Sequence, residues 1–153
     1  MIGALLLKIG AHRAWEAMNR RDLDYLDRNM AEDVVIEIPG RPPVGGRFVG
    51  RAAVREATQR WMDSLASFEY RVIHEAVTNP LAIGLSKTVL TEFELVESTH
   101  HGRTHRARGI DVSEVKGGKL VADRTYIFSL EAEEAIRPPA AGKLEVVRAE
   151  ATG

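Results

Sequence analysis

The sequence contains no cysteine among its 153 residues. This absence excludes disulfide bonds, thiolate metal sites, iron–sulfur clusters and a cysteine nucleophile. Charge of one sign is not in excess either, because 21 Lys and Arg residues are balanced by 22 Asp and Glu residues. Nucleic-acid binding depends on a clustered positive surface that neutralises phosphates, so we expect no nucleic-acid partner.

Long apolar segments are also missing. The longest apolar run near the N-terminus covers residues 2–7, and no cationic stretch precedes it. A secretory signal has an apolar core of about 7–15 residues, and a membrane helix needs about 18 apolar residues or more. We therefore expect a cytoplasmic protein with no membrane partner, and the length of the chain is typical of one domain.

Apolar residues at helical spacing predict three helices in the first half of the chain. Their stripes run from Leu7 to Met18, from Leu23 to Met30 after an N-cap at Asp22, and from Val54 to Leu65. Residues 34–38 form a short β-branched strand between the second and third helices. Residues 39–50 follow it and contain three Pro and four Gly, a density that predicts a connection without regular structure.

From residue 68 onward the apolar period changes to two, which predicts four strands at residues 68–78, 81–97, 104–116 and 119–130. Gly117-Gly118 joins the last two strands as a two-residue turn of the type that permits positive φ at both positions. Three turns linking four strands predict an antiparallel meander. Helices with an apolar stripe need a sheet face to cover, so the predicted fold class is α+β.

Several local strings carry a resemblance to a known family: WEAMNRRDLD at residues 15–24, AEDVVIEIPG at 31–40, GRAAVR at 50–55, GIDV at 109–112 and GKLV at 118–121. In these strings and in the order of its elements, the chain resembles the SnoaL-like branch of the nuclear transport factor 2-like superfamily. Ketosteroid isomerase, polyketide cyclase and limonene epoxide hydrolase are relatives within that superfamily. The resemblance covers about residues 5–130.

The resemblance implies a cone-shaped, cystatin-like α+β fold, in which a curved antiparallel sheet wraps around N-terminal helices. It also implies a pocket between the sheet and the long helix, and many family members are homodimers. We assign residues 1–136 to this SnoaL-like domain. Residues 137–153 are predicted to be a loosely ordered C-terminal tail, because Pro138-Pro139 stops any helix.

Family members, by this resemblance, hold hydrophobic small molecules and work without a metal or a cofactor. Their chemistry is usually done by one or two carboxylates and a hydrogen-bond donor, and an apolar pocket raises the pKa of such acids towards neutrality. Asp111, in the string GIDV, matches the protonated Asp of the isomerase, which donates a hydrogen bond to an oxyanion.

The sequence departs from the active sites of these relatives at three positions. Trp15 stands where the isomerase has a tyrosine donor, and Ile38 stands where it has its general-base Asp, so we do not expect a steroid-type isomerase. Thr125 occupies the position of an Asp in the epoxide hydrolase pattern. Asp123 precedes Thr125 by two residues and shares its strand face, so a carboxylate is still available one pleat away.

We predict that Asp111 and Asp123 carry out proton transfer. His105 is a third catalytic candidate, because it has the parity of Asp111 on the same strand. The predicted substrate-binding residues are Trp15, Trp61 and Thr125. Most of these residues also have an interpretation without function. Asp111 could be a solvated or salt-bridged carboxylate, and Asp123 a core carboxylate with a partner. His105 could be an ordinary strand histidine, and the two tryptophans could serve core packing alone.

No metal site is predicted. His100, His101 and His105 straddle a turn and alternate between strand faces, and no acidic residue is spaced to complete a ligand set. The arginines of residues 103–108 are expected to form cross-strand pairs with Glu92 or Glu94.

The leading interpretation is a cofactor-independent acid–base enzyme of cyclase, isomerase or hydrolase type that acts on a hydrophobic small molecule. The alternative is a module of the same fold that binds a small molecule or dimerises without catalysis. The lost tyrosine and the lost strand carboxylates support the alternative, because a retired active site would show such losses.

Overall fold

The computed structural model of the chain describes residues 2–40, 45–78 and 86–128. Its elements in chain order are α1 (Ile2–Asn19), α2 (Leu23–Asn29), β1 (Met30–Ile38), β2 (Gly46–Val49), α3 (Arg51–Asp63), β3 (Leu65–Val77), β4 (Lys87–Thr99), β5 (Thr104–Lys116) and β6 (Lys119–Ile127). The predicted tail at 137–153 and the predicted strand start at residue 81 lie outside the described residues. None of the helices in the described part of the chain is both long and apolar enough to cross a membrane.

The six strands form one sheet in the order β2-β1-β6-β5-β4-β3. The four strands from β3 to β6 pair antiparallel with their sequence neighbours, which confirms the predicted meander. β1 pairs in parallel with β6, so the antiparallel sheet that the resemblance implied is mixed at this one pairing. Both glycines of the turn between β5 and β6 have positive φ, at 59° for Gly117 and 77° for Gly118, as predicted.

The Pro- and Gly-rich connection contains β2, a strand that the sequence analysis missed. β2 pairs antiparallel with β1, and Phe48 lies opposite Ile36. Both side chains pack against the buried cluster of Met30, Val34 and Val54. The burial of Phe48 therefore stabilises a strand of only four residues within a segment whose composition favours turns.

Two predicted helix ends were placed too far along the chain. Met30 begins β1 by pairing with Leu120, and Leu65 begins β3 by pairing with Thr99. Both residues are buried in the core all the same, so their apolar character fitted either element. The predicted N-cap is confirmed, because Asp22 accepts a hydrogen bond of 2.9 Å from the Tyr25 backbone N–H.

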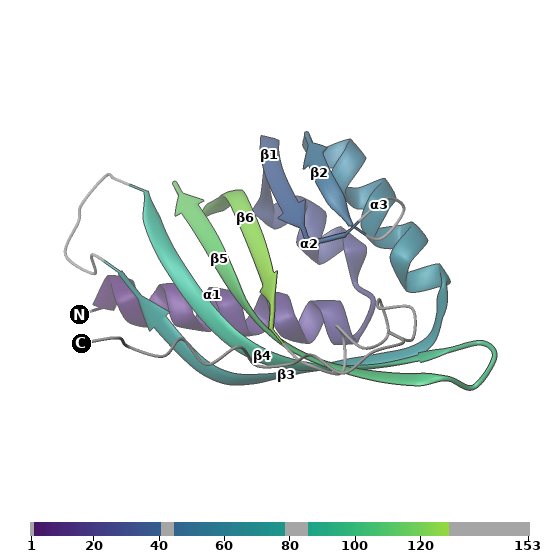
Figure 1. The fold of residues 1–153 in the computed structure, drawn as a ribbon. Coiled ribbons are helices and arrows are strands. Elements are labelled where there is room, and N and C mark those ends of the chain that lie inside the picture. Colours follow the sequence, from purple (N-terminus) through teal and green to yellow (C-terminus); the bar gives the residue numbers. More distant parts are fainter. Residues whose placement is uncertain (1, 41–44, 79–85, 129–153) are drawn as a thin grey trace, which may run out of the picture.

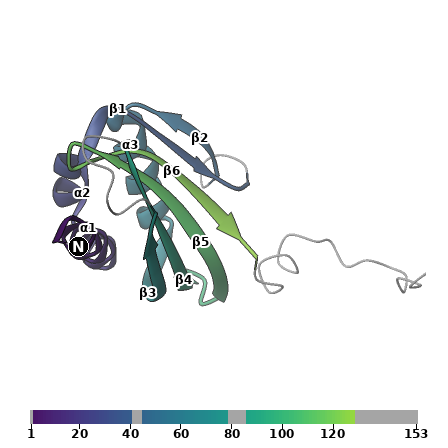
Figure 2. The ribbon, with the colours of Figure 1, turned by 90° about the vertical axis from the view of Figure 1, so that its left-hand side faces the viewer.

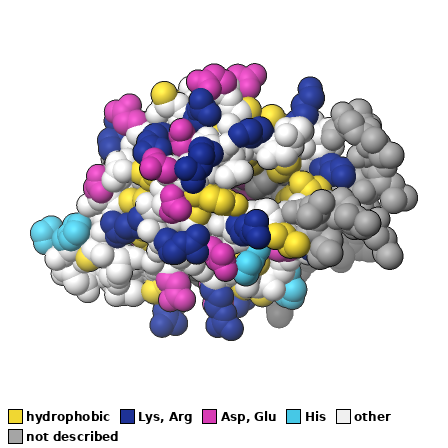
Figure 3. Space-filling view, turned by 180° about the vertical axis from the view of Figure 1, so that it is seen from behind, with side chains coloured by type: hydrophobic (Ala, Val, Ile, Leu, Met, Phe, Trp, Pro, Cys, Tyr) yellow, Lys and Arg dark blue, Asp and Glu magenta, His cyan; other side chains and the backbone are white. Residues whose placement is uncertain are grey.

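The sheet curves, and the helices lie within its curve (Figures 1 and 2). α1 packs on β3 and β4, whereas α3 packs on β1, β2 and β3. This arrangement is the expected cone-like α+β fold. In the view of Figure 3, Lys and Arg side chains are intermixed with Asp and Glu side chains over the face that is seen. The predicted cross-strand pairing is confirmed at Arg108, whose Nη2 lies 2.6 Å from Glu94 Oε1.

Aromatic rings join the helices to the inside of the sheet. The Trp15 ring of α1 lies 4.8 Å from the Tyr70 ring and 5.5 Å from the Phe93 ring, centroid to centroid. The Trp61 ring of α3 lies 4.6 Å from the Phe68 ring and 6.1 Å from the Tyr70 ring. Tyr70 therefore lies between the two helices, and the space beside it is bounded by rigid side chains.

Gly109 lies opposite Phe93 in the sheet, at a point where no side chain has room. A Cβ atom on Gly109 would lie 2.6 Å from the Phe93 ring and 2.6 Å from the backbone oxygen of Tyr126. Because that oxygen cannot move aside cheaply, Gly109→Ala should lower the free energy of unfolding by about 1–3 kcal/mol in a urea titration.

The matched control for this prediction is Gly10→Ala on α1, where a Cβ meets no atom within 4 Å. This substitution should raise the free energy of unfolding by about 0.5–1 kcal/mol, because alanine is the better helix former. If the Gly109→Ala variant were as stable as the Gly10→Ala variant, the close approach of Phe93 to the backbone would be disproved.

Candidate functional site

Two acids and two hydroxyls form a polar group on β5 and β6. Asp111 pairs directly with Thr125, and Ser113 pairs directly with Asp123, so the four side chains share one face of the sheet. The Ser113 hydroxyl donates a hydrogen bond of 2.5 Å to Asp123 Oδ1. Asp111 is only 6% exposed. Asp111 Oδ1 has no hydrogen-bond partner among the described residues.

Burial is the main influence on both carboxyl groups of this pair. Burial raises the pKa of Asp111 well above its usual range, the negative charge of Asp123 raises it further, and a hydrogen bond from Thr125 lowers it. Burial raises the pKa of Asp123 to about 6, against opposing effects of the Ser113 hydrogen bond and the Arg124 charge. The pKa of Asp123 lies at about 6, and the negative charge of ionised Asp123 favours the protonated form of Asp111.

A cavity of about 210 Å³ lies between the helices and the sheet. This volume equals that of about seven molecules of liquid water. Its lining comprises Met18, Ile36, Ile38, Phe48, Val54, Ala57, Thr58, Trp61, Tyr70, Phe93, Leu95, Glu97, Ala107, Thr125 and Ile127. The wall is mostly apolar, and its few polar groups come from Thr58, Tyr70, Glu97 and Thr125.

The predicted site residues divide into those that line this cavity and those that lie behind its wall. Trp61 and Thr125 line it. Asp111 and Asp123 do not, although Thr125, the partner of Asp111 across the strands, does. Trp15 lies behind the wall too, because its ring contacts Tyr70 and Phe93, which line the cavity. Of the polar group on β5 and β6, Thr125 is thus the member that lines the cavity.

Glu97 is a cavity residue that the sequence analysis missed. It lies on β4 directly opposite His105 on β5, and His105 itself does not line the cavity. Burial raises the pKa of Glu97, whereas the nearby His105 and a hydrogen bond from Trp61 lower it. The sequence contained a usable signal, because Glu97 has the strand parity of the buried residues Phe93 and Leu95.

Tyr70 is the second cavity residue that was missed. Burial strongly raises the pKa of its hydroxyl, and the negative charges of Asp111, Glu97 and Asp123 raise it further. Tyr70 is therefore a neutral hydrogen-bond donor at any physiological pH. Tyr70 lies two positions after Phe68 on β3, so both side chains have the same parity, and this signal could have identified Tyr70.

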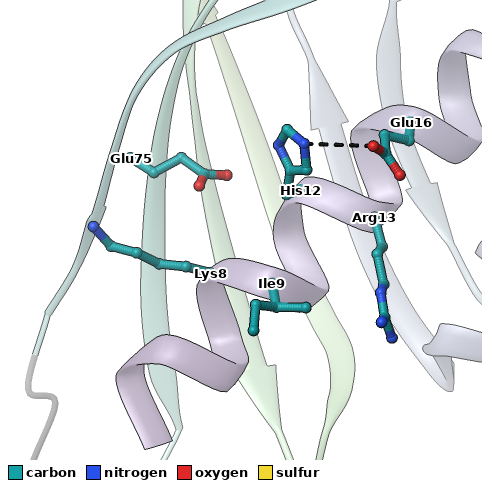
Figure 4. A pocket seen from close by; sticks show the side chains of 6 residues that line it. All are labelled: Lys8, Ile9, His12, Arg13, Glu16 and Glu75. Atoms are coloured by element: carbon teal, nitrogen blue, oxygen red, sulfur yellow. Dashed lines mark ion pairs between the residues drawn. The ribbon is translucent and has the colours of Figure 1, made fainter. Parts of the chain in front are cut away.

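A second hollow of about 370 Å³ lies between α1 and β3. It is lined by Lys8, Ile9, His12, Arg13, Glu16 and Glu75, and Figure 4 shows Glu75 directed from β3 towards α1. His12 Nε2 lies 3.5 Å from Glu16 Oε1. Glu75 Oε1 has no hydrogen-bond partner among the described residues, and burial raises the pKa of Glu75 whereas the nearby His12 and Lys8 lower it. Within the described parts of the chain, no group of three or more His, Asp and Glu side chains is arranged to hold a metal ion.

Comparison with known proteins identifies a family for most of the chain. A family model described as a SnoaL-like domain matches residues 11–122. No curated protein matches the chain.

Three solved structures illustrate the similarity in fold. Bal32a, from a soil-derived mobile gene cassette, is 20% identical with a TM-score of 0.72, over 87% of this chain and 97% of that chain. An epoxide hydrolase of M. tuberculosis, described as LEH-like, is 20% identical with a TM-score of 0.64, over 82% and 84% of the two chains. RV0760c from Mycobacterium tuberculosis, in complex with estradiol-17β-hemisuccinate, is 20% identical with a TM-score of 0.65, over 80% and 92%.

The raised pKa of Asp123 predicts a pH dependence of stability with a definite sign. Between the usual pKa of 3.8 and the folded value of about 6, the folded chain binds more protons at Asp123 than the unfolded chain does. The free energy of unfolding therefore falls as the pH rises through this window. Asp123→Asn removes the effect and keeps an oxygen for Ser113. The free energy of unfolding of this variant, minus that of the wild type, should therefore increase by about 2 kcal/mol from pH 4.5 to pH 7.5.

Urea titrations at the two pH values measure this gain. Asp33→Asn, at an exposed position of β1, is the control for loss of one carboxylate. If this difference in the free energy of unfolding increased no more for Asp123→Asn than for Asp33→Asn, the Asp123 carboxylate would not be held in a desolvated site.

Proposed function

The chain belongs to the SnoaL-like domain family of nuclear transport factor 2-like proteins, and on this premise we propose that it is a cofactor-independent acid–base enzyme acting on a hydrophobic small molecule. The ligand would occupy the cavity between the helices and the sheet. The epoxide hydrolase and the steroid-bound protein of similar fold support a small-molecule partner. Their identity of 20% to this chain leaves the reaction to be argued from its own residues.

The observation that carries this proposal is the buried pair of Asp111 and Asp123. Burying a carboxyl group destabilises a fold unless hydrogen bonds or charges compensate, and Asp111 Oδ1 has no hydrogen-bond partner among the described residues. Two adjacent acids with different pKa values are an arrangement suited to catalysis, because one can donate a proton while the other stays ionised.

Thr125 connects this pair to the cavity. Its hydroxyl both interacts with Asp111 and belongs to the cavity wall. In the proposed step, Asp111 passes its proton to the Thr125 oxygen, and the Thr125 hydroxyl passes its own proton to an oxygen of the ligand. Asp111 becomes a carboxylate. The proton that the ligand releases as the product forms returns to Asp111 through the Thr125 hydroxyl, and repulsion from ionised Asp123 favours this return. Tyr70 can donate a second hydrogen bond to the developing charge.

The proposal predicts that the two acids are required for turnover. Small cyclic ketones and epoxides would be supplied in D2O, with NMR following hydrogen exchange next to the carbonyl and mass spectrometry following ring opening. A variant with both Asp111→Asn and Asp123→Asn should convert any substrate of the wild type about 10²–10⁴-fold more slowly. Urea unfolding would check that this variant is folded. Unchanged turnover in the double variant would refute the proposed role of the pair.

Thr125 offers a sharper test of the relay. Thr125→Val keeps the shape of the side chain but removes the hydroxyl, so the rate should fall by about 10-fold or more. Thr125→Ser keeps the hydroxyl and should retain most of the rate. Equal rates for the valine and serine variants would show that the proton takes another route.

The second candidate function is a binding module that holds a small molecule without converting it. The position of both acids behind the cavity wall favours this alternative, since neither can touch a ligand directly. Mass spectrometry of the protein mixed with metabolites separates the two functions. A ligand that binds and is recovered unchanged, together with no turnover of any compound in the panel, would favour the binding module.

Three finer expectations belong to the same proposal. The resemblance supports a homodimer, a cytoplasmic location, and a SnoaL-like domain that extends to about residue 136. Sedimentation of the full chain measures the first of these, and a mass of one chain would refute it.

A further inference from the structure

One end of the cavity carries a negative charge that the proposed proton relay does not use. We propose that Glu97 makes the cavity selective for ligands that carry a protonated amine on a small apolar body, and against carboxylates of the same shape. The inference rests on the proposed function for the place of the ligand, and it adds the chemical class of that ligand.

Glu97 is the carboxyl group that a ligand can touch without any rearrangement. It lines the cavity from β4, between Phe68 on one neighbouring strand and His105 on the other. Along β4 it lies six positions from Thr91, the strand partner of Asp111. Glu97 and Thr125, the strand partner of Asp111, therefore lie at different ends of the cavity lining, and an ammonium group at Glu97 leaves the other end of a ligand beside Thr125.

Aromatic side chains surround the space next to Glu97. Trp61, Tyr70 and Phe93 line the cavity, and the Tyr70 and Phe93 rings are 5.4 Å apart, centroid to centroid. The faces of such rings attract cations, and the attraction grows when water is excluded. A carboxylate beside aromatic faces combines charge with cation–π attraction, which is the chemistry that recognises an ammonium group on an apolar body.

In the described part of the chain, the cavity wall offers an anionic ligand no lysine or arginine side chain. Arg21, whose guanidinium lies 5.1 Å from the Phe68 ring centroid, donates hydrogen bonds to the backbone oxygens of Met62 and Leu65. His105 lies opposite Glu97 in the sheet and does not line the cavity.

The charges around Tyr70 support the same conclusion. Asp111, Glu97 and Asp123 all raise the pKa of the Tyr70 hydroxyl, which lies within the cavity wall. Negative charge at Glu97 and in the Asp111–Asp123 pair therefore acts on the Tyr70 side chain, which lines the cavity. A ligand carboxylate would add a further negative charge to a space with low dielectric, whereas an ammonium group would relieve the repulsion.

Three probes of nearly equal shape test the inference: benzylammonium, benzyl alcohol and benzoate. Their binding to the full chain at pH 7.5 can be followed by chemical-shift changes of backbone amides in NMR spectra. Benzylammonium should bind at least about 10-fold more tightly than benzoate, with benzyl alcohol between them. Glu97→Gln should reduce this preference by about 10-fold and change the affinity for benzyl alcohol by no more than about 2-fold.

Glu94→Gln is the matched control, because Glu94 lies on the same strand but on the opposite face, where it pairs with Arg108. This variant loses the same charge and should keep the preference for benzylammonium. The amide spectrum of each variant reports whether it is folded. Equal binding of the three probes, tighter binding of benzoate, no binding of any probe, or an unchanged preference in the Glu97→Gln variant would overturn the inference.

The outcomes distinguish this inference from the proposed enzyme activity. A preference for benzylammonium in a protein that turns over no compound would overturn the acid–base enzyme and leave the charge selectivity standing. Turnover that depends on Asp111 and Asp123, in a protein that binds benzoate as well as benzylammonium, would overturn the charge selectivity alone.

Discussion

The burial of two neighbouring carboxyl groups is the constraint on which this site depends. Asp111 and Asp123 can both lie inside the sheet only if one of them keeps its proton, because two adjacent negative charges in a desolvated place repel strongly. The register of β5 and β6 sets Thr125 and Ser113 opposite these acids. A slip of one residue between β5 and β6 would place Asp123 and Thr125 on the face opposite to that of Asp111 and Ser113. The register shift between Glu114 and Val115, together with the two-glycine turn, therefore sets the site.

The space next to this polar group depends on the aromatic side chains and on Gly109. Trp15 and Trp61 attach two different helices to Tyr70, and rings of this size keep the helices from closing on the sheet. The absence of a side chain at Gly109 lets the Phe93 ring approach the backbone of β5. The cavity is therefore bounded by side chains with few accessible rotamers, which favours a site whose shape changes little when a ligand binds.

Local patterns in the sequence could predict much of this structure. Alternating parity predicted the faces of β5 and β6 and hence the shared face of Asp111, Asp123 and Thr125, and glycine chemistry predicted the turn between them. The parallel pairing of β1 with β6 could not be predicted in this way, because it joins residues about 90 positions apart. β2 was missed because its stability comes from the contact of Phe48 with the core, not from its own composition.

The sequence also could not show which of the site residues line the cavity. Parity shows which face a side chain occupies, but not whether it meets the cavity. Thr125 lines the cavity, whereas Asp111, its strand partner on the same face, does not. Glu97 and Tyr70 have the correct parity, yet their role depends on α1 and α3, which close the space above them.

The protonation of the buried pair is tested most directly by carbon-13 NMR of the aspartate carboxyl groups as a function of pH. Asp123 should titrate with a midpoint at about 6, and Asp111 should stay protonated at pH values where ordinary aspartates are ionised. Titration of both carboxyl groups at about 3.9, the value of an exposed aspartate, would contradict the shared proton and the acid–base chemistry derived from it.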